Sequence, residues 1–258
     1  MTVTHLYRYP FKGLSPEALA SVTLCADQGF PIDRRFALAR HGIKFDQEKP
    51  APLPKTEFLM LMKDEKLATL STQFDEEKQV LTIRDPTGAA LVSGLVETAE
   101  GRADIETFFH SFLGESLQGP PRLVRAQGHQ FTDVSVVSPA MMRSISLINL
   151  ASVRALEEAT GETVNPLRFR ANLYFDNNKP WSEFDWMDKD ITVGTVPMSV
   201  VFRTRRCAAT QVNPDTGERD INIPRHIKDH FGHTDLGIYA EVKGNGVVAP
   251  GDVISAPL

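Results

Sequence analysis

One cysteine lies where the sequence could support chemistry. Cys207 follows an apolar run at residues 200–202 and comes directly after Arg205 and Arg206. A neighbouring guanidinium favours the charged form of a thiol, and the thiolate is the nucleophilic and metal-binding form of cysteine. Cys207 is therefore our candidate for the chemical centre of the chain. The alternative is a buried structural cysteine beside solvated arginines, because free cysteine often behaves as a small hydrophobic residue.

The cysteine count limits the chemistry further. The chain contains two cysteines, Cys25 and Cys207. Two cysteines exclude a disulfide framework, a four-cysteine zinc site and an all-cysteine iron–sulfur cluster built from this chain alone. We expect Cys25 to be a core residue and any redox cofactor to be held by other groups.

Composition indicates an ordinary globular protein. Of its 258 residues, 41% are hydrophobic and 24% are charged, with a formal net charge of -5. Such a charge gives no electrostatic reason to expect nucleic acid as a partner. The first residues lack the basic and apolar regions of a secretory signal, and no run approaches the roughly 20 apolar residues that span a bilayer. We therefore expect a cytoplasmic protein that does not bind a membrane.

Three histidines near the end of the chain are a weaker signal. His226 and His230 are one helical turn apart, and His233 follows them. No glutamate completes a zinc helix of the His-Glu-x-x-His type. We interpret this segment as a short solvated helix and not as a metal site.

The elements that must position Cys207 are mostly short strands. Strand-like runs separated by turns extend to residue 95, and a helix over 105–113 is predicted to begin at Asp104. Asn149 is predicted to cap a second helix that ends at Gly161. Strands are expected at 198–202 and 209–212, on both sides of Cys207. The fold class is thus mainly β with a few helices (α+β). We predict a β-barrel-like domain over residues 1–118 and a second β-rich domain over residues 119–258, divided near the glycines and prolines of 114–121.

Several short motifs, taken in order, resemble one known family. It comprises proteins built on the molybdenum cofactor sulfurase C-terminal (MOSC) domain, preceded by a β-barrel domain, and its amidoxime-reducing members are similar to this chain. The resemblance covers essentially the whole sequence. It is carried by residues 6–12 (LYRYPFK), 33–36 (DRRF), 168–173 (RFRANL), 206–217, 237–239 and 251–253.

The resemblance implies a molybdenum cofactor and a set of residues that bind it. In this family, the cysteine at the position of Cys207 is the protein ligand of molybdenum, and the other sulfurs come from a molybdopterin. A soft thiolate suits such a metal. The phosphate of the pterin calls for basic donors, and family position implies Lys12, Arg34 and Arg170. Further contacts to cofactor or substrate are implied for Ser152, Asn172, Arg206, Thr210 and Tyr239.

Three positions depart from the family pattern. Gly13 replaces a frequent serine, Ala171 replaces a proline, and Leu150 stands where an acidic residue is often found. The first and third of these changes would remove polar groups from the expected cofactor pocket.

The resemblance also implies an activity. It points to an oxidoreductase that reduces small N-hydroxylated compounds by two-electron removal of oxygen at molybdenum. The chain shows neither a flavin motif nor iron–sulfur cysteines, so electrons would come from a separate flavin or iron–sulfur protein. One alternative is a sulfur or cofactor carrier that uses Cys207 as a persulfide or transient ligand. No pyridoxal-phosphate domain is expected beside two β-rich domains. The third hypothesis is a binding protein that holds no cofactor.

Overall fold

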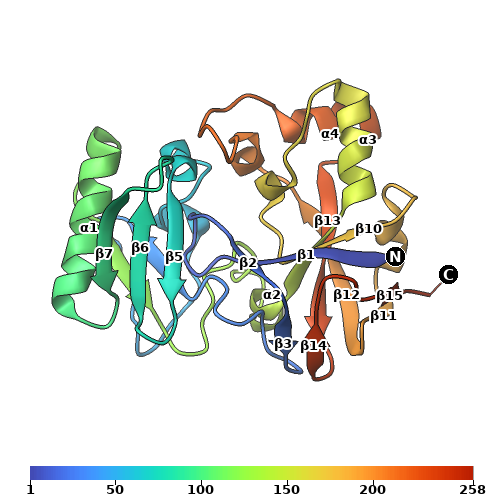
Figure 1. The fold of residues 1–258 in the computed structure, drawn as a ribbon, viewed down its shortest axis with the longest axis horizontal. Coiled ribbons are helices and arrows are strands. Elements are labelled where there is room, and N and C mark those ends of the chain that lie inside the picture. Colours follow the sequence, from blue (N-terminus) through green and yellow to red (C-terminus); the bar gives the residue numbers. More distant parts are fainter. Residues whose placement is uncertain (258) are drawn as a thin grey trace.

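The computed structural model describes residues 1–257 and shows two lobes, of which the larger is built on an eight-stranded sheet (Figure 1). The strand order is β15-β11-β12-β13-β9-β10-β1-β2. Most pairs are antiparallel, whereas β9 and β10 are parallel because helix α3 connects them. The strands are β1 (Thr2–Arg8), β2 (Glu17–Leu19), β9 (Ile145–Asn149), β10 (Leu173–Asp176), β11 (Asp190–Val193), β12 (Val196–Arg205), β13 (Asp235–Val242) and β15 (Ile254–Ser255).

Two helices cover one face of this sheet. Helix α3 (Leu150–Thr160) begins at Asn149, whose side chain accepts a hydrogen bond from the N–H of Ala151, and ends at Gly161 in a left-handed conformation. Helix α4 (Ile223–Phe231) lies beside it, and Leu156 and Ile227 meet Ile148 of β9 in one apolar cluster. The predicted caps of α3 are thus confirmed. A second core lies on the other face, under the paired strands β3 (Val22–Leu24) and β14 (Gly246–Val248).

The smaller lobe carries a three-stranded meander and one long helix. The strands are β5 (Ser71–Asp75), β6 (Val80–Arg84) and β7 (Ala90–Leu95), and α1 (Ala99–Leu113) packs against them (Figure 1). Helix α1 starts earlier than predicted, because Thr98 and not Asp104 caps it. Gly101 permits this start, since a Cβ there would lie 2.4 Å from the backbone of Leu95. Strands β4 (Phe36–Ala39) and β8 (Arg122–Arg125) pair next to the meander.

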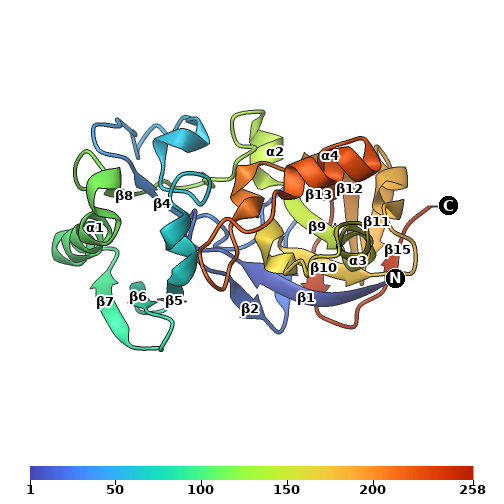
Figure 2. The same cartoon turned by 90° about the horizontal axis from the view of Figure 1, so that it is seen from above.

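Short helical turns complete the chain, and one corrects a prediction. Residues 209–212 were expected to form a strand, but η6 (Ala208–Gln211) is a 3-10 helix. Figure 2 shows the chain between β12 and α4, in orange, at the junction of the two lobes. The remaining turns are α2 (Pro139–Arg143), η1 (Lys55–Glu57), η2 (Glu65–Thr69), η3 (Gly114–Ser116), η4 (Pro166–Phe169) and η5 (Ser182–Trp186).

The first 24 residues share sheets with the second half of the chain. Strand β1 pairs with β10, and β3 pairs with β14. The division after residue 118 stays a prediction, but these pairings place β1 to β3 with the larger lobe. No helix among residues 1–257 is long and apolar enough to cross a bilayer.

Candidate functional site

A cavity of about 270 Å³ lies at the junction of the lobes, and we call it the Cys207 cavity. Eight of the nine predicted site residues line it, although they come from distant parts of the sequence. Strand β12 leads into Cys207, β13 contributes Tyr239, and the turn after β1 contributes Lys12. The eight residues are Lys12, Arg34, Arg170, Asn172, Arg206, Cys207, Thr210 and Tyr239.

Cys207 stands at the N-terminal end of η6, and its backbone is firmly held. The N–H and the hydroxyl of Thr210 both donate to the carbonyl oxygen of Cys207, at 3.0 and 2.9 Å. The guanidinium of Arg206 donates to the carbonyl oxygens of Leu236, at 2.7 Å, and Phe169, at 3.0 Å. Thr210 and Arg206 therefore fix the position of the thiol by binding the backbone around it.

Three charged side chains, those of Lys12, Asp133 and Lys55, form a row of contacts that ends at this thiol. The sequence analysis did not predict the contacts of Lys55 and Asp133. Nζ of Lys55 lies 3.3 Å from Sγ of Cys207 and 3.0 Å from a carboxylate oxygen of Asp133. The other oxygen of Asp133 accepts from Nζ of Lys12, which also donates to the carbonyl of Phe131 at 3.0 Å. Lys55 and Asp133 were missed because neither belongs to a motif. Lys55 precedes the cysteine by 152 residues, so no local pattern connects the two.

The charges of Lys12, Asp133 and Lys55 shift one another's pKa values. Burial opposes ionisation of Lys55, but Asp133 and Cys207 outweigh it and raise the pKa of Lys55. Burial likewise opposes the Asp133 carboxylate, but Lys12 and Lys55 hold the pKa of Asp133 well below its ordinary value. For Lys12, burial prevails and lowers the pKa. The carboxylate of Asp133 is shared between two ammonium groups.

Two arginines of the cavity have a strained backbone. Arg34 and Arg170 adopt left-handed conformations with φ of 46° and 52°, and their guanidinium carbons lie 4.3 and 4.4 Å from the ring centre of Tyr9. Arg34 donates to Asp33 at 2.5 Å and to the carbonyl of Arg170 at 2.7 Å, and Arg170 donates to the carbonyl of Leu14 at 2.7 Å. Non-glycine residues in this region are typical of functional sites.

The positive charge at these arginines is only partly compensated. Burial, together with the like charge of Arg34, lowers the pKa of Arg170 to about 10. The guanidinium remains protonated at neutral pH, but its environment disfavours the charge. An anion bound in the cavity would relieve this penalty.

Asn172 and Tyr239 both line the cavity, but their hydrogen bonding differs. Oδ1 of Asn172 accepts from the backbone N–H and the hydroxyl of Ser146, at 3.2 and 3.1 Å, so its carbonyl end serves to join β9 to β10. The phenol of Tyr239 makes no hydrogen bond to any residue in the described chain. Burial raises the pKa of Tyr239, so the phenol keeps its proton and offers a free donor to the cavity.

Ser152, the ninth predicted residue, lies elsewhere. It is buried in α3, donates to Glu183 at 2.8 Å and accepts from the N–H of Trp181 at 2.8 Å. Nδ2 of Asn149 donates to the same carboxylate at 2.9 Å. We call Asn149, Ser152 and Glu183 the Glu183 cluster. Its hydrogen bonds run within the protein, so Ser152 does not contribute to the Cys207 cavity.

The structure also shows where the three residues that depart from the family pattern lie. Leu150 packs in the apolar cluster beneath α3 and α4, so this change removes nothing from the cavity. Gly13 lines the cavity with φ of 82°, and a Cβ there would lie 2.9 Å from the carbonyl oxygen of Leu59. The backbone around Gly13 thus leaves no room for a serine. Ala171 is buried, and its N–H donates to the hydroxyl of Tyr174 at 3.1 Å.

The lining of the Cys207 cavity suits an anionic ligand. Two buried polar atoms of lining residues, Oγ1 of Thr204 and Nε of Arg168, have no protein partner in residues 1–257. One thiol is available for a soft metal. Asp33 and Asp133 are the acidic residues of the lining, and they face a larger basic set, which comprises Lys12, Lys55, Arg34, Arg168, Arg170, Arg205 and Arg206. These residues fit a molybdopterin, in which a phosphate and a sulfur-bound metal are combined.

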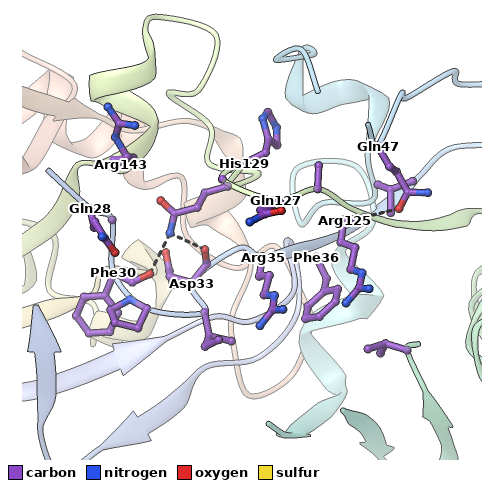
Figure 3. A pocket seen from close by; sticks show the side chains of 18 of the residues that line it. Gln28, Phe30, Asp33, Arg35, Phe36, Gln47, Arg125, Gln127, His129 and Arg143 are labelled. Atoms are coloured by element: carbon purple, nitrogen blue, oxygen red, sulfur yellow. Dashed lines mark hydrogen bonds between the residues drawn. The ribbon is translucent and has the colours of Figure 1, made fainter. Parts of the chain in front are cut away.

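A larger, open groove of about 950 Å³ is shown in Figure 3, and Asp33 lines both this groove and the Cys207 cavity. Arg35, Arg125 and Arg143 are spread along it, and Arg125 is paired with Glu97 at 2.5 Å. The side-chain amide of Gln130, in the lining of the groove, donates to the carbonyls of Phe30 and Asp33, both at 3.0 Å. None of the predicted site residues lines this groove, so size alone does not identify the site.

The histidines of α4 do not assemble with other ligands. The rings of His226 and His230 stack with centres 6.2 Å apart. Within residues 1–257, no group of three or more His, Cys, Asp or Glu side chains is placed to hold a metal ion.

Comparison with known families identifies the family of the chain and agrees with its fold. The MOSC domain matches residues 127–255, and the MOSC N-terminal beta barrel domain matches residues 1–116. The chain therefore belongs to the MOSC domain family, which is associated with the molybdenum cofactor. The resemblance seen in the motifs and the strand-rich α+β fold class are both confirmed.

Individual relatives are distant and longer. A protein of Danio rerio named molybdenum cofactor sulfurase is 24% identical over 92% of this chain, but this covers 31% of the relative. One of the same name from Drosophila mojavensis is 36% identical over 53% of the chain and 17% of the relative. The chain thus spans less than a third of the length of these relatives. Among solved structures, the YUAD protein of Bacillus subtilis aligns over 98% of this chain and 94% of its own, with 12% identity and a TM-score of 0.43.

Proposed function

We propose that this chain binds a molybdenum cofactor in the Cys207 cavity and reduces N-hydroxylated compounds. The observation that carries the proposal is a single thiol in a cavity whose lining has more basic than acidic side chains. Cys207 would be the protein ligand of the metal. Lys12, Arg34 and Arg170 would anchor the phosphate of the pterin, because guanidinium and ammonium groups form strong charge-assisted bonds to phosphate.

The residues of the cavity suit each part of this reaction. When bound, the cofactor supplies two electrons and a site that takes up oxygen. A C=N–OH group then gains two electrons and two protons and yields C=NH and water. Tyr239 presents a protonated phenol toward the cavity, and Phe202, which is 51% exposed, places an aromatic face at its lining. These two side chains would hydrogen-bond and pack against an organic substrate. Electrons would come from a separate flavin or iron–sulfur protein.

The deciding experiment uses protein purified from a host that makes the cofactor. We expect close to stoichiometric molybdenum by elemental analysis, and reduction of benzamidoxime with an artificial electron donor. Cys207→Ser should abolish the activity. Cys25→Ser is the matched control, because Cys25 is the second free cysteine and does not line the cavity. A preparation without molybdenum would refute the proposal.

A sulfur carrier is the second candidate, favoured by the relatives named molybdenum cofactor sulfurase. In that case Cys207 would bear a persulfide. Mass spectrometry of the freshly purified protein distinguishes the two, because the carrier would show one added sulfur atom on Cys207 and no bound metal.

A further inference from the structure

A buried tyrosine lies against the two strained arginines of the Cys207 cavity. Tyr9 follows β1 and is fully buried, and it does not line the cavity itself. The guanidinium carbons of Arg34 and Arg170 lie over its ring, 4.3 and 4.4 Å from the ring centre. One aromatic ring therefore contacts two arginines that are 136 residues apart in the sequence.

Hydrogen bonds also join Tyr9 to Arg34. The N–H of Tyr9 donates to Oδ1 of Asp33 at 2.8 Å, and the N–H of Arg34 donates to the carbonyl of Tyr9 at 2.7 Å. The other oxygen of Asp33 accepts from the guanidinium of Arg34 at 2.5 Å. The same guanidinium donates to the carbonyl of Arg170 at 2.7 Å. These bonds fix the backbone of Tyr9 beside both arginines, so the ring keeps its place.

The ring of Tyr9 attracts both guanidinium groups. Burial raises the pKa of Tyr9 well above its ordinary value, so the phenol is uncharged at neutral pH. The face of a neutral aromatic ring carries partial negative charge and attracts a cation placed over it. Burial, and then the like charge of Arg34, disfavour the charge on Arg170. The ring offsets part of this penalty and helps to hold two like charges close together.

Both arginines keep hydrogen-bond donors for a ligand. A guanidinium has five N–H donors. Within residues 1–257, the side chain of Arg34 makes two hydrogen bonds and that of Arg170 makes one. None of their nitrogens is among the buried atoms that lack a partner in this part of the chain. The unused donors are therefore accessible, and both side chains line the cavity.

We propose that Tyr9 is a positioning residue that holds Arg34 and Arg170 as a pair for one phosphate-like oxyanion. The ring and not the hydroxyl has this role, because the hydroxyl of Tyr9 has no hydrogen-bond partner within residues 1–257. The biological meaning rests on the proposed function, in which these arginines would anchor the phosphate of the pterin. Phosphate binding itself needs no cofactor, so it can be measured separately.

The test uses the full chain from a host that cannot make the cofactor. The affinity for inorganic phosphate is obtained from the rise of the melting temperature with phosphate concentration at constant ionic strength. Arg170→Met gives the response that remains without this site. We expect Tyr9→Leu to weaken phosphate binding about tenfold, and Tyr9→Phe to leave it within about twofold.

Phe175→Leu is the matched control for the loss of a buried aromatic ring. Phe175 is also fully buried, but it stacks on Trp186, with ring centres 5.4 Å apart, and does not line the cavity. Its substitution should lower the melting temperature and leave the phosphate affinity unchanged. An equal loss of affinity in Phe175→Leu and Tyr9→Leu would show that Tyr9 acts through stability alone, which overturns the inference.

A second series keeps the shape of the ring at position 9. Phenylalanine at this position is compared with its monofluorinated and trifluorinated analogues, because fluorine withdraws negative charge from the ring face. Phosphate affinity should fall stepwise with the number of fluorines, by about threefold for the trifluorinated ring. The melting temperature without phosphate should change little. A packing role would leave the affinity constant, which overturns the inference even where Tyr9→Leu does not fold.

The outcomes distinguish this inference from the proposed function. Tyr9→Leu with the phosphate affinity of the unmodified chain overturns the inference, and so does an unmodified chain that responds to phosphate only as Arg170→Met does. A chain that binds no molybdenum in a cofactor-making host but shows the predicted losses refutes the proposed function and supports the role of Tyr9. A chain that binds molybdenum, but whose phosphate affinity is independent of the ring at position 9, does the opposite.

Discussion

The Cys207 cavity and the Glu183 cluster are both built from buried polar side chains, yet their hydrogen bonding differs. In the cluster, the Glu183 carboxylate accepts from Asn149 and Ser152, and Ser152 in turn accepts from the N–H of Trp181. In the cavity, basic groups outnumber acids, and the buried hydroxyl of Thr204 has no partner within residues 1–257. Buried polar groups are normally satisfied, so the hydrogen bonds of the Glu183 cluster are typical of a structural role, whereas the excess of basic groups in the cavity favours an anionic ligand.

Among the substitutions considered, we expect Arg170→Met in the Cys207 cavity to have the largest effect. Arg170→Met should weaken retention of the cofactor by about 10- to 100-fold, because a charged hydrogen bond contributes roughly 1.5–3 kcal/mol. Molybdenum per protein after extensive dialysis measures the loss. Arg154→Met is the control, since Arg154 forms a surface ion pair with Asp176. Full retention by Arg170→Met would show that the uncompensated charge does not serve an anion.

Gly13 tests whether the cavity of this chain can accept the serine that is common in the family. Gly13→Ser should lower the free energy of unfolding by about 2–3 kcal/mol, because a positive φ and a close backbone contact both oppose a side chain. Urea unfolding measures the change. Gly42→Ser has a similar φ of 79° but open space around its Cβ, so it should cost only about 1 kcal/mol. Equal losses in the two variants would argue against the contact with Leu59.

A substitution of Ser152 tests directly whether this residue belongs to the Glu183 cluster or to the Cys207 cavity. Ser152→Ala should lower the free energy of unfolding by about 1–2 kcal/mol, since it leaves the N–H of Trp181 and part of the Glu183 carboxylate without a partner. It should not change the molybdenum content. Ser71→Ala, at an exposed position of β5, provides the control. Loss of cofactor from a folded Ser152→Ala protein would show that Ser152 contributes to cofactor binding.

The smallest effect concerns the pH dependence of stability. Burial raises the pKa of Glu183 above its ordinary value of 4.5. The folded protein therefore holds this proton to higher pH than the unfolded chain does, and stability falls as the pH rises between the two values, by at most about 1.4 kcal/mol per pH unit. Glu183→Gln should flatten this fall. Urea unfolding from pH 4.5 upward would show it, and parallel curves for the two proteins would contradict the assignment.

Much of the site was predictable from order along the chain. The short motifs containing Lys12, Arg34, Arg170 and Cys207 identified residues that the fold does bring to one cavity. Local signals also predicted α3, because a cap at Asn149 and a glycine at its end depend on backbone geometry within a few residues. Local signals failed at 209–212, where Thr210 bonds to the carbonyl of Cys207 and closes a 3-10 turn instead of extending a strand.

The sequence by itself thus determined the family and the strand-rich fold, and it predicted Cys207 as the centre of a site. Only the tertiary structure decided which polar groups share a cavity. It turned Ser152 toward Glu183, because the direction of a helical side chain depends on what the helix packs against. It also brought Lys55 to Cys207 across 152 residues, and no local pattern records a contact that forms only when the two lobes meet.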